Sequence, residues 1–186
     1  LRKGDVFIAL RGVAHDGHEH AWAALQAGAL LCIVDSRGYK RLAANAPLSP
    51  CIVVRDTLES YGDIARMYRR LHDLPVLGVT GSNGKTGTKE MIAAALRTSF
   101  NVLATEGNYN NQIGLPTTLL RLDASHDAAV IEMGTNQPGD IPYLCSVAEP
   151  THGLITNIGL AHIERLISRE GIAAEKASLF RALPGD

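Results

Sequence analysis

The fold of this chain is decided by one stretch of sequence, Thr80-Gly81-Ser82-Asn83-Gly84-Lys85-Thr86. An apolar run at residues 76–79 precedes it, and a helix-like segment that continues to Leu96 follows it. Strand, glycine loop, Lys-Thr and helix in this order predict a P-loop. In such a loop, backbone N–H groups and the lysine hold a polyphosphate, and the threonine hydroxyl reaches Mg²⁺. Because Val79 occupies the first glycine position of the usual pattern, the alternative is a glycine-rich turn that caps an ordinary helix.

The composition is compatible with an enzyme and argues against two other classes of protein. Of 186 residues, 46% are hydrophobic and 20% are charged, which is enough to bury a core in one or two domains. The net charge of −1 indicates no basic face, so we expect no nucleic-acid partner. No apolar run approaches the roughly 20 residues that span a bilayer, so we expect no membrane insertion.

Three cysteines, Cys32, Cys51 and Cys145, lie among apolar residues. Their odd number and apolar surroundings predict buried free thiols rather than a disulfide framework, which suits a reducing cytoplasm. We therefore expect a cytoplasmic protein, and we expect it to be a monomer. The chain opens at Leu1 without a methionine, so we also expect that an N-terminal segment is missing.

Strand and helix signals alternate along the chain in two blocks that meet near Asp73-Leu74-Pro75. This alternation predicts the α/β class, with one domain over residues 1–73 and a second over residues 74–186. In the first block, strands are expected at 6–10, 30–34 and 52–54, with helices over 21–29 and from Asp56 to Leu71. Asp56 and Glu59 resemble a capping box at the start of that last helix.

The second block repeats the alternation at greater length. Strands separated by helices imply a mostly parallel sheet, with ligand sites at the carboxyl ends of the strands. We expect strands at 76–79, 102–104, 129–133 and 154–157, and helices at 86–98, 115–122, 141–147 and 171–183.

An amide-rich loop, residues 105–114, follows the second strand of this block. Its asparagines, Asn108 and Asn111 among them, have side-chain amides that can bind phosphate or substrate oxygens without adding charge. The alternative is a structural loop whose asparagines satisfy Asx turns. The sequence leaves both possibilities open.

The last two strands end in further polar groups. Glu132 ends a strand beside the P-loop, where a second Mg²⁺ ligand is expected, although a solvated strand end is the alternative. His162 lies beyond the next strand on the same edge of the sheet. Lys176 lies in an apolar helical stretch, and its spacing alone assigns it no role.

Together these motifs resemble the Mur ligase family. The resemblance rests on 80–86, on the loop 105–114, on Glu132-Met133-Gly134 with Pro138-Gly139, and on Ile155-Thr156-Asn157 with Ala161-His162. In the first block, residues 4–12 and Asp16-Gly17-His18 are similar to the family's UDP-sugar-binding N-terminal domain. Within the family, the series is most similar to the members that join D-alanyl-D-alanine to UDP-MurNAc-tripeptide.

The resemblance implies ATP-dependent amide formation through an acyl phosphate. It implies a UDP-MurNAc-peptide-binding domain at 1–73 and a P-loop ATPase domain at 74–186, the latter cut short by the end of the chain. We therefore expect the isolated chain to be inactive. The implied cofactors are ATP and two Mg²⁺ ions, and the implied substrates are UDP-MurNAc-tripeptide and D-alanyl-D-alanine.

The resemblance also implies roles for single residues. Lys85, His162 and Lys176 are the expected catalytic residues, and Lys176 matches a lysine that the family carbamylates. The expected metal ligands are Thr86 for the first Mg²⁺, and Glu132, His162 and Lys176 for the second. The residues expected to bind the nucleotide are Thr80, Gly81, Ser82, Asn83, Gly84, Lys85, Thr86, Asn108 and Asn111.

Several positions depart from the family pattern. Gly87 replaces a hydroxyl residue, Gln137 a histidine and Asp140 a glutamate, and residues 165–167 replace a glycine-rich turn. Two alternative functions stay open: another ligase of the superfamily, such as MurE or folylpolyglutamate synthase, and a nucleotide-binding module without catalysis. The presence of Glu132, His162 and Lys176 together argues against the second, because a pure switch has no need of a second metal.

Overall fold

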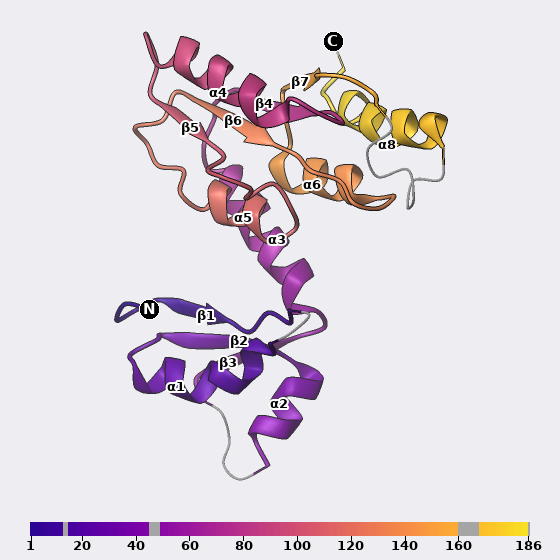
Figure 1. Cartoon of the computed structure of the whole chain (residues 1–186). Coiled ribbons are helices and arrows are strands. Elements are labelled where there is room, and N and C mark those ends of the chain that lie inside the picture. The colour runs from indigo at the N-terminus through magenta and orange to yellow at the C-terminus, as the bar shows by residue number, and fades with distance from the viewer. Residues whose placement is uncertain (13–14, 45–48, 160–167, 186) are drawn as a thin grey trace. The chain divides into compact units, whose positions relative to one another are not determined.

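The computed structural model describes residues 1–12, 15–44, 49–159 and 168–185. The chain forms two compact units, Leu1–Tyr61 and Gly62–Asp186 (Figure 1). Both units are built from parallel strands that alternate with helices, which confirms the α/β class. None of the helices in these ranges is both long enough and apolar enough to cross a membrane.

The first unit contains a three-stranded parallel sheet in the order β1-β2-β3. Its core gathers small and aliphatic side chains from the strands and from the helices beside them, including Ala21, Ala24, Cys32 and Val34. The elements are β1 (Val6–Ile8), η1 (Gly17–His20), α1 (Ala21–Gln26), β2 (Leu31–Asp35), α2 (Ser36–Leu42) and β3 (Cys51–Val54).

The second unit contains a four-stranded sheet in the order β5-β6-β4-β7, and every pairing is parallel. Ligands of open parallel sheets bind at the carboxyl ends of the strands, at the point where the strand order reverses. The elements are β4 (Val76–Thr80), α4 (Lys85–Leu96), β5 (Val102–Ala104), α5 (Gly114–Leu119), β6 (Ala128–Glu132), α6 (Asp140–Ala148), β7 (His152–Ile155) and α8 (Arg169–Arg181).

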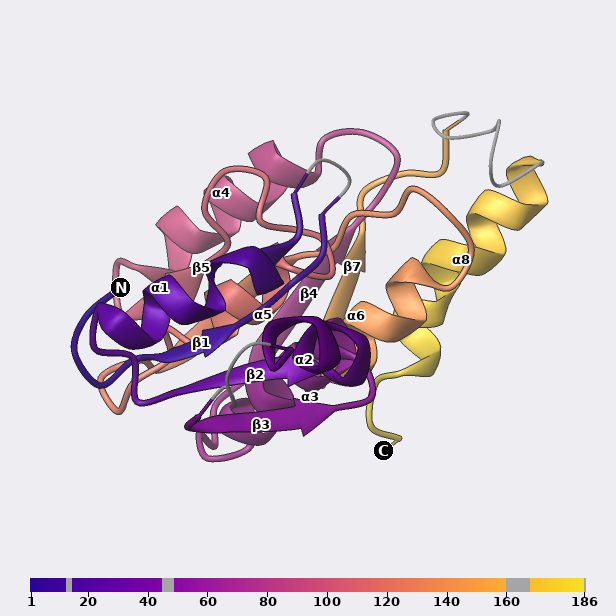
Figure 2. The ribbon, with the colours of Figure 1, turned by 90° about the horizontal axis from the view of Figure 1, so that it is seen from below.

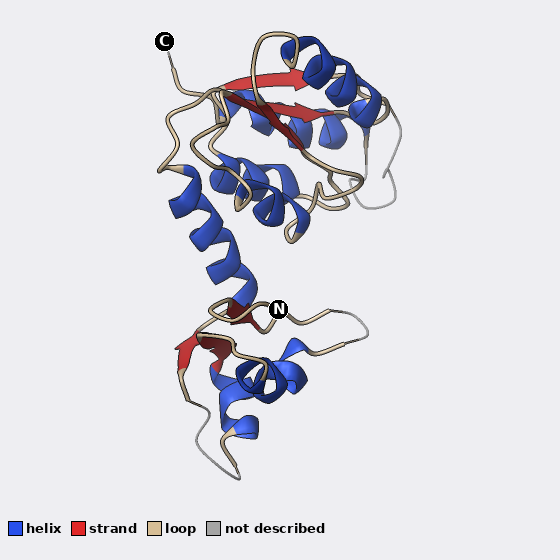
Figure 3. Ribbon diagram, turned by 90° about the vertical axis from the view of Figure 1, so that its left-hand side faces the viewer, coloured by secondary structure: helices blue, strands red, loops and turns tan. Residues whose placement is uncertain are grey.

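Helices cover both faces of this second sheet (Figures 2 and 3). Alternate residues of one strand serve the two faces: Ala128 and Val130 of β6 pack on the side of α4, whereas Ala129 and Ile131 pack on the side of α5, α6 and α8. All of β6 is buried, as expected for a strand covered on both faces.

Helix α3 (Thr57–Arg69) runs through the division between the two units. Asp56 caps it, because its carboxylate accepts hydrogen bonds from the backbone N–H groups of Leu58 and Glu59. Farther along α3, Ala65 joins the core of the second unit, and the Tyr68 hydroxyl donates to the carbonyl of Leu122 at 2.8 Å. The division after Tyr61 therefore differs from the border expected after residue 73.

The expected strands and long helices all occur, with ends that shift by a few residues. Helix α2 was not predicted, because Ser36–Leu42 carries no clear apolar stripe. The three cysteines are free thiols, as predicted; Cys32 and Cys145 are buried and Cys51 is partly so.

Candidate functional site

The glycine loop joins the carboxyl end of β4 to the start of α4, as a P-loop does. Gly81 has a φ of +151°, and a Cβ atom there would lie 1.9 Å from Thr156 Oγ1. Gly84, with a φ of +79°, is the N-cap of α4. Only glycine adopts both conformations without strain, so the glycines set the path of the loop.

The N-terminus of α4 has no side-chain cap. Helix α6 also starts at a glycine without a side chain of its own to cap it, but the carboxylate of Glu175 accepts from Gly139 N and Ile141 N. An uncapped N-terminus carries free N–H donors and a partial positive charge, which together favour a bound anion. The contrast between the two helices indicates that the anion site belongs to α4.

Lys85 is the first residue of α4, and its Nζ donates to the carbonyl oxygen of Gly81 at 2.8 Å. The ammonium group therefore lies over the loop, within reach of a ligand held there. Thr86 is exposed in the same helical turn. Both residues lie in the first turn of α4, and their roles toward phosphate and Mg²⁺ stay predictions.

The segment after β7 braces the P-loop, which the sequence analysis did not predict. Asn83 N donates to Asn157 Oδ1 at 3.1 Å, and Asn157 Nδ2 donates back to Asn83 O at 2.9 Å. The Ser82 hydroxyl bonds both backbone groups of Gly159. Because these partners are about 75 residues apart in sequence, no local pattern could indicate the pairing.

Glu132 ends β6 directly beside β4, where its register partner is Val79. Its side chain is 1% exposed, and Oε1 accepts from Asn110 Nδ2 at 2.8 Å. The other oxygen, Oε2, is buried without a hydrogen-bond partner among the described residues. A buried carboxylate oxygen without a hydrogen bond destabilises the folded state unless a cation or a donor binds it. The solvated strand end considered above is therefore wrong.

The loop after β5 contributes Asn110 to this site. Asn108 and Asn111 had been expected to bind the nucleotide, but Asn111 Oδ1 accepts from Ile113 N and Gly114 N at the start of α5. That oxygen makes the Asx turn considered as the alternative. Asn108 is exposed, and its carbonyl accepts from Asn110 N at 2.8 Å. A ligand role for either asparagine stays a prediction.

Lys176 lies on the buried side of α8 and is 1% exposed. Burial, together with the nearby charge of Lys85, lowers its pKa from 10.5 to about 8, and Glu175 partly opposes that shift. His162 and the departure at 165–167 lie outside the described residues.

Comparison with protein families decides the relationship, since residues 79–186 match the Mur ligase middle domain. The chain belongs to the Mur ligase family. It is 46% identical over 184 residues to the UDP-N-acetylmuramoyl-tripeptide--D-alanyl-D-alanine ligase of Synechocystis and 41% identical over 187 residues to that of Bacillus subtilis. These matches cover 99% and 100% of the chain, which spans about 40% of the length of each relative.

Solved structures of Mur ligases superpose closely on the chain. The MurF ligase of Thermotoga maritima, in complex with ADP, has a TM-score of 0.88 and 34% identity, and the match covers 98% of this chain and 41% of that one. MurF of Acinetobacter baumannii has a TM-score of 0.87, also at 34% identity, and the match covers 98% and 39%. A 2,6-diaminopimelate ligase, at 19% identity and a TM-score of 0.61 over 98% and 40%, shares the fold alone.

A second buried lysine links the P-loop helix of this Mur ligase chain to the strand of Glu132. Lys89 is fully buried in α4, and its Nζ donates to the carbonyl of Thr105. Thr105 Oγ1 in turn accepts from Glu132 N at 2.9 Å. The sequence analysis missed Lys89, although a lysine four residues after Lys85 on one helix face is a signal that could have drawn attention to it.

Gly87 lies in the exposed first turns of α4, and a Cβ atom there meets nothing within 4 Å. We expect Gly87→Ala to raise the free energy of unfolding by up to about 1 kcal/mol, because alanine favours helix over glycine. Urea unfolding measures the change. Gly81→Ala is the contrasting variant and should destabilise, since its Cβ meets Thr156; a Gly87→Ala protein that is no more stable than the parent contradicts the prediction.

In the first unit, the motif Asp16-Gly17-His18 forms an internal network. Buried His18 contacts Asp16 Oδ1 through Nδ1 at 2.6 Å and accepts from Asp35 N through Nε2 at 3.1 Å. Burial alone would raise the pKa of Asp16, but hydrogen bonds from His18 and Arg41 outweigh it and lower that pKa. These side chains hold the start of α2 against η1, so the motif has a structural role whatever the unit binds.

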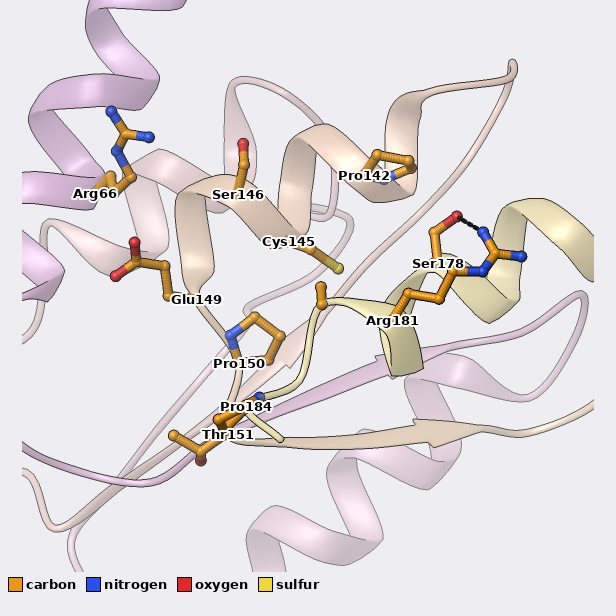
Figure 4. A pocket seen from close by; sticks show the side chains of 11 residues that line it. Arg66, Pro142, Cys145, Ser146, Glu149, Pro150, Thr151, Ser178, Arg181 and Pro184 are labelled. Carbon is orange, nitrogen blue, oxygen red and sulfur yellow. Dashed lines mark hydrogen bonds between the residues drawn. The ribbon is translucent and has the colours of Figure 1, made fainter. Parts of the chain in front are cut away.

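A hollow of about 700 Å³ lies on the second unit (Figure 4). It is lined by Pro150 and Thr151, which precede β7, and by Arg181 and Pro184 at the end of α8. These residues mark the amino ends of the parallel strands, opposite the edge that carries the P-loop. The hollow is therefore not the candidate nucleotide site.

Proposed function

We propose that this chain is the part of an ATP-dependent ligase that holds ATP and activates a carboxylate. The observation that carries the proposal is the uncapped N-terminus of α4, with Lys85 above it and the buried carboxylate of Glu132 one strand away. The substrates follow from the relatives, whose names specify UDP-N-acetylmuramoyl-tripeptide and D-alanyl-D-alanine.

In the proposed reaction, the carboxylate of UDP-MurNAc-tripeptide attacks the γ-phosphorus of ATP, which forms an acyl phosphate and releases ADP. The amine of D-alanyl-D-alanine then attacks the acyl carbon. The resulting tetrahedral intermediate loses phosphate and a proton to give the amide. Lys85 turns from Gly81 O to the β- and γ-phosphate oxygens, and the N–H groups at the start of α4 bind the same phosphates.

The residues present fit Mg²⁺ beside the phosphates. Glu132 Oε2 is a buried carboxylate oxygen without a partner among the described residues, and oxygen ligands suit this ion. Mg²⁺ supplies positive charge that offsets the repulsion between triphosphate and carboxylate. We assign Thr86 to one ion, and Glu132, His162 and a carbamylated Lys176 to a second. Among the described residues, no group of three His, Cys, Asp or Glu side chains is placed to hold a metal ion by itself, and the proposed set adds Thr86 and the carbamate to Glu132 and His162.

Lys176 is suited to carbamylation because it is buried and its lowered pKa leaves more neutral amine near neutral pH. The neutral amine adds to CO₂, and loss of a proton leaves an anionic carbamate. We further propose that residues 1–73 bind the UDP-sugar end of the substrate, and that the ligase acts as a cytoplasmic monomer.

The test is a ligase assay on the protein that contains this chain, with UDP-MurNAc-tripeptide, ATP, Mg²⁺ and one amine at a time. D-Alanyl-D-alanine should give phosphate release together with the amide product, identified by mass. Parallel assays replace the acceptor together with the amine, and product from UDP-N-acetylmuramoyl-L-alanyl-D-glutamate with 2,6-diaminopimelate, or from a folate with glutamate, would instead support MurE or folylpolyglutamate synthase. ATP binding without phosphate release from any combination would support the non-catalytic module and overturn the proposal.

A further inference from the structure

Two charged residues occupy the buried stripe of α8. Ile172, Glu175, Lys176 and Leu179 are the buried residues of this helix, at the spacing of one helix face. Leu179 packs in the core against the glycines of β4 and β7, since a Cβ atom at Gly78 or Gly153 would lie 2.9 or 3.0 Å from its side chain. A glutamate and a lysine beside such a core residue need specific partners.

The partners of Glu175 are backbone groups of another helix. Its Oε2 accepts from Gly139 N at 2.9 Å, and its Oε1 accepts from Ile141 N at 2.7 Å. Both donors belong to the first turn of α6, which has no other side-chain cap and carries a partial positive charge. Two charge-assisted hydrogen bonds to one carboxylate fix both its distance and its orientation.

The backbone groups that bond Glu175 lie shortly after β6, the strand that ends at Glu132. Residues 133–139 connect β6 to α6, and Gly134 N within this connection donates to Asn110 O, whose side chain bonds Glu132. Glu175 therefore ties α8, which carries Lys176, to the connection that leaves Glu132. Glu175 belongs to none of the motifs that resemble the Mur ligase family.

We propose that Glu175 is a positioning residue that holds Lys176 at the nucleotide edge of the sheet by clamping α8 to the first turn of α6. The inference rests on the proposed function of Lys176. Glu175 itself touches neither substrate nor nucleotide. Its carboxylate sets the rotation of α8, and the next residue along the helix, Lys176, is thereby held in the buried stripe.

Glu175→Gln tests the clamp, because glutamine keeps the shape but presents one acceptor oxygen in place of two. Asp140→Asn is the matched control. The Asp140 carboxylate also accepts two backbone N–H groups near the start of α6, those of Asn136 and Gln137, but it makes no bond to α8. Both variants remove one carboxylate charge at the start of α6, and only Glu175→Gln loses a hydrogen bond between α6 and the helix of Lys176.

The readout is the rate at which acetic anhydride acetylates Lys176, followed by peptide mass spectrometry on the whole chain in bicarbonate-free buffer. Labelling at about pH 9.5, above the lowered pKa of Lys176, leaves the amine largely neutral in every variant, so that loss of the Glu175 charge does not by itself change the rate. We expect labelling of Lys176 to rise about tenfold in Glu175→Gln and less than about twofold in Asp140→Asn, because the first variant favours local opening of α8.

Equal labelling of Lys176 in both variants would overturn the clamp, even if Glu175→Gln lowers the melting temperature. A [¹³C]bicarbonate experiment on the unmodified chain separates this inference from the proposed function. Absence of a carbamate signal at Lys176 together with the tenfold difference in labelling would show that the clamp exists and that the carbamylation proposal is wrong.

Discussion

Replacing Lys85 with alanine is expected to weaken ATP binding by about 100-fold or more while leaving the melting temperature nearly unchanged. The lysine is the cation nearest the uncapped start of α4, and its contacts in the structure are the carbonyls of Gly81 and Ser82. Hydrogen bonds between an ammonium group and phosphate oxygens are charge-assisted and therefore stronger than hydrogen bonds between neutral groups. The two loop carbonyls, in contrast, gain hydration when the side chain is removed, so little stability is lost.

Calorimetric titration with a nonhydrolysable ATP analogue and Mg²⁺ measures the affinity, and a thermal melt measures the stability. Arg97→Ala is the matched control, because it removes a cation from the other end of the same helix, where the side chain reaches the carbonyl of Val102. An unchanged affinity in Lys85→Ala, or an equal loss in Arg97→Ala, would remove Lys85 from the phosphate site.

Replacing Lys176 with alanine should abolish ligase activity in the protein that contains this chain. The side chain is buried, so alanine leaves a cavity at the place where the carbamate is proposed to support the second Mg²⁺. Small carboxylates such as formate or acetate can enter that cavity and supply the missing anion. We therefore expect partial rescue of activity by millimolar carboxylate, measured as phosphate release together with product mass.

Lys89→Ala is an informative control, because Lys89 is the other fully buried lysine and bonds a backbone carbonyl rather than facing the proposed metal. Carboxylates should not rescue any activity that this variant loses. Full activity of Lys176→Ala without added carboxylate would show that the buried amine has no part in the reaction.

Local sequence was sufficient to predict the fold class and the phosphate loop. The β-branched runs and the helical spacing of apolar residues are properties of neighbours in the chain, and the order of strand, glycine loop and helix appears within 21 residues, from Val76 to Leu96. Glu132 could be selected for the same reason, since its position at the end of a predicted strand places it on the ligand edge of a parallel sheet.

Helix α8 carries a sequence signal that indicates a buried interaction, namely two charged residues on its apolar stripe. Glu175 and Lys176 occupy the stripe defined by Ile172 and Leu179, where apolar side chains are the rule. Charged residues on a stripe of this kind indicate a buried interaction. Even so, the pattern alone names no partner for either residue.

The sequence by itself determined the two-block α/β organisation, the P-loop with Lys85 and the strand end at Glu132. Tertiary structure alone decided that Asn110 bonds Glu132, that Asn157 pairs with Asn83, and that Glu175 caps α6. Helices and strands depend on residues a few positions apart, whereas each of these side chains meets a partner 22 to 74 residues away. Such contacts arise only when the packed sheet brings its loops to one edge, so the identity of the residues alone could not reveal them.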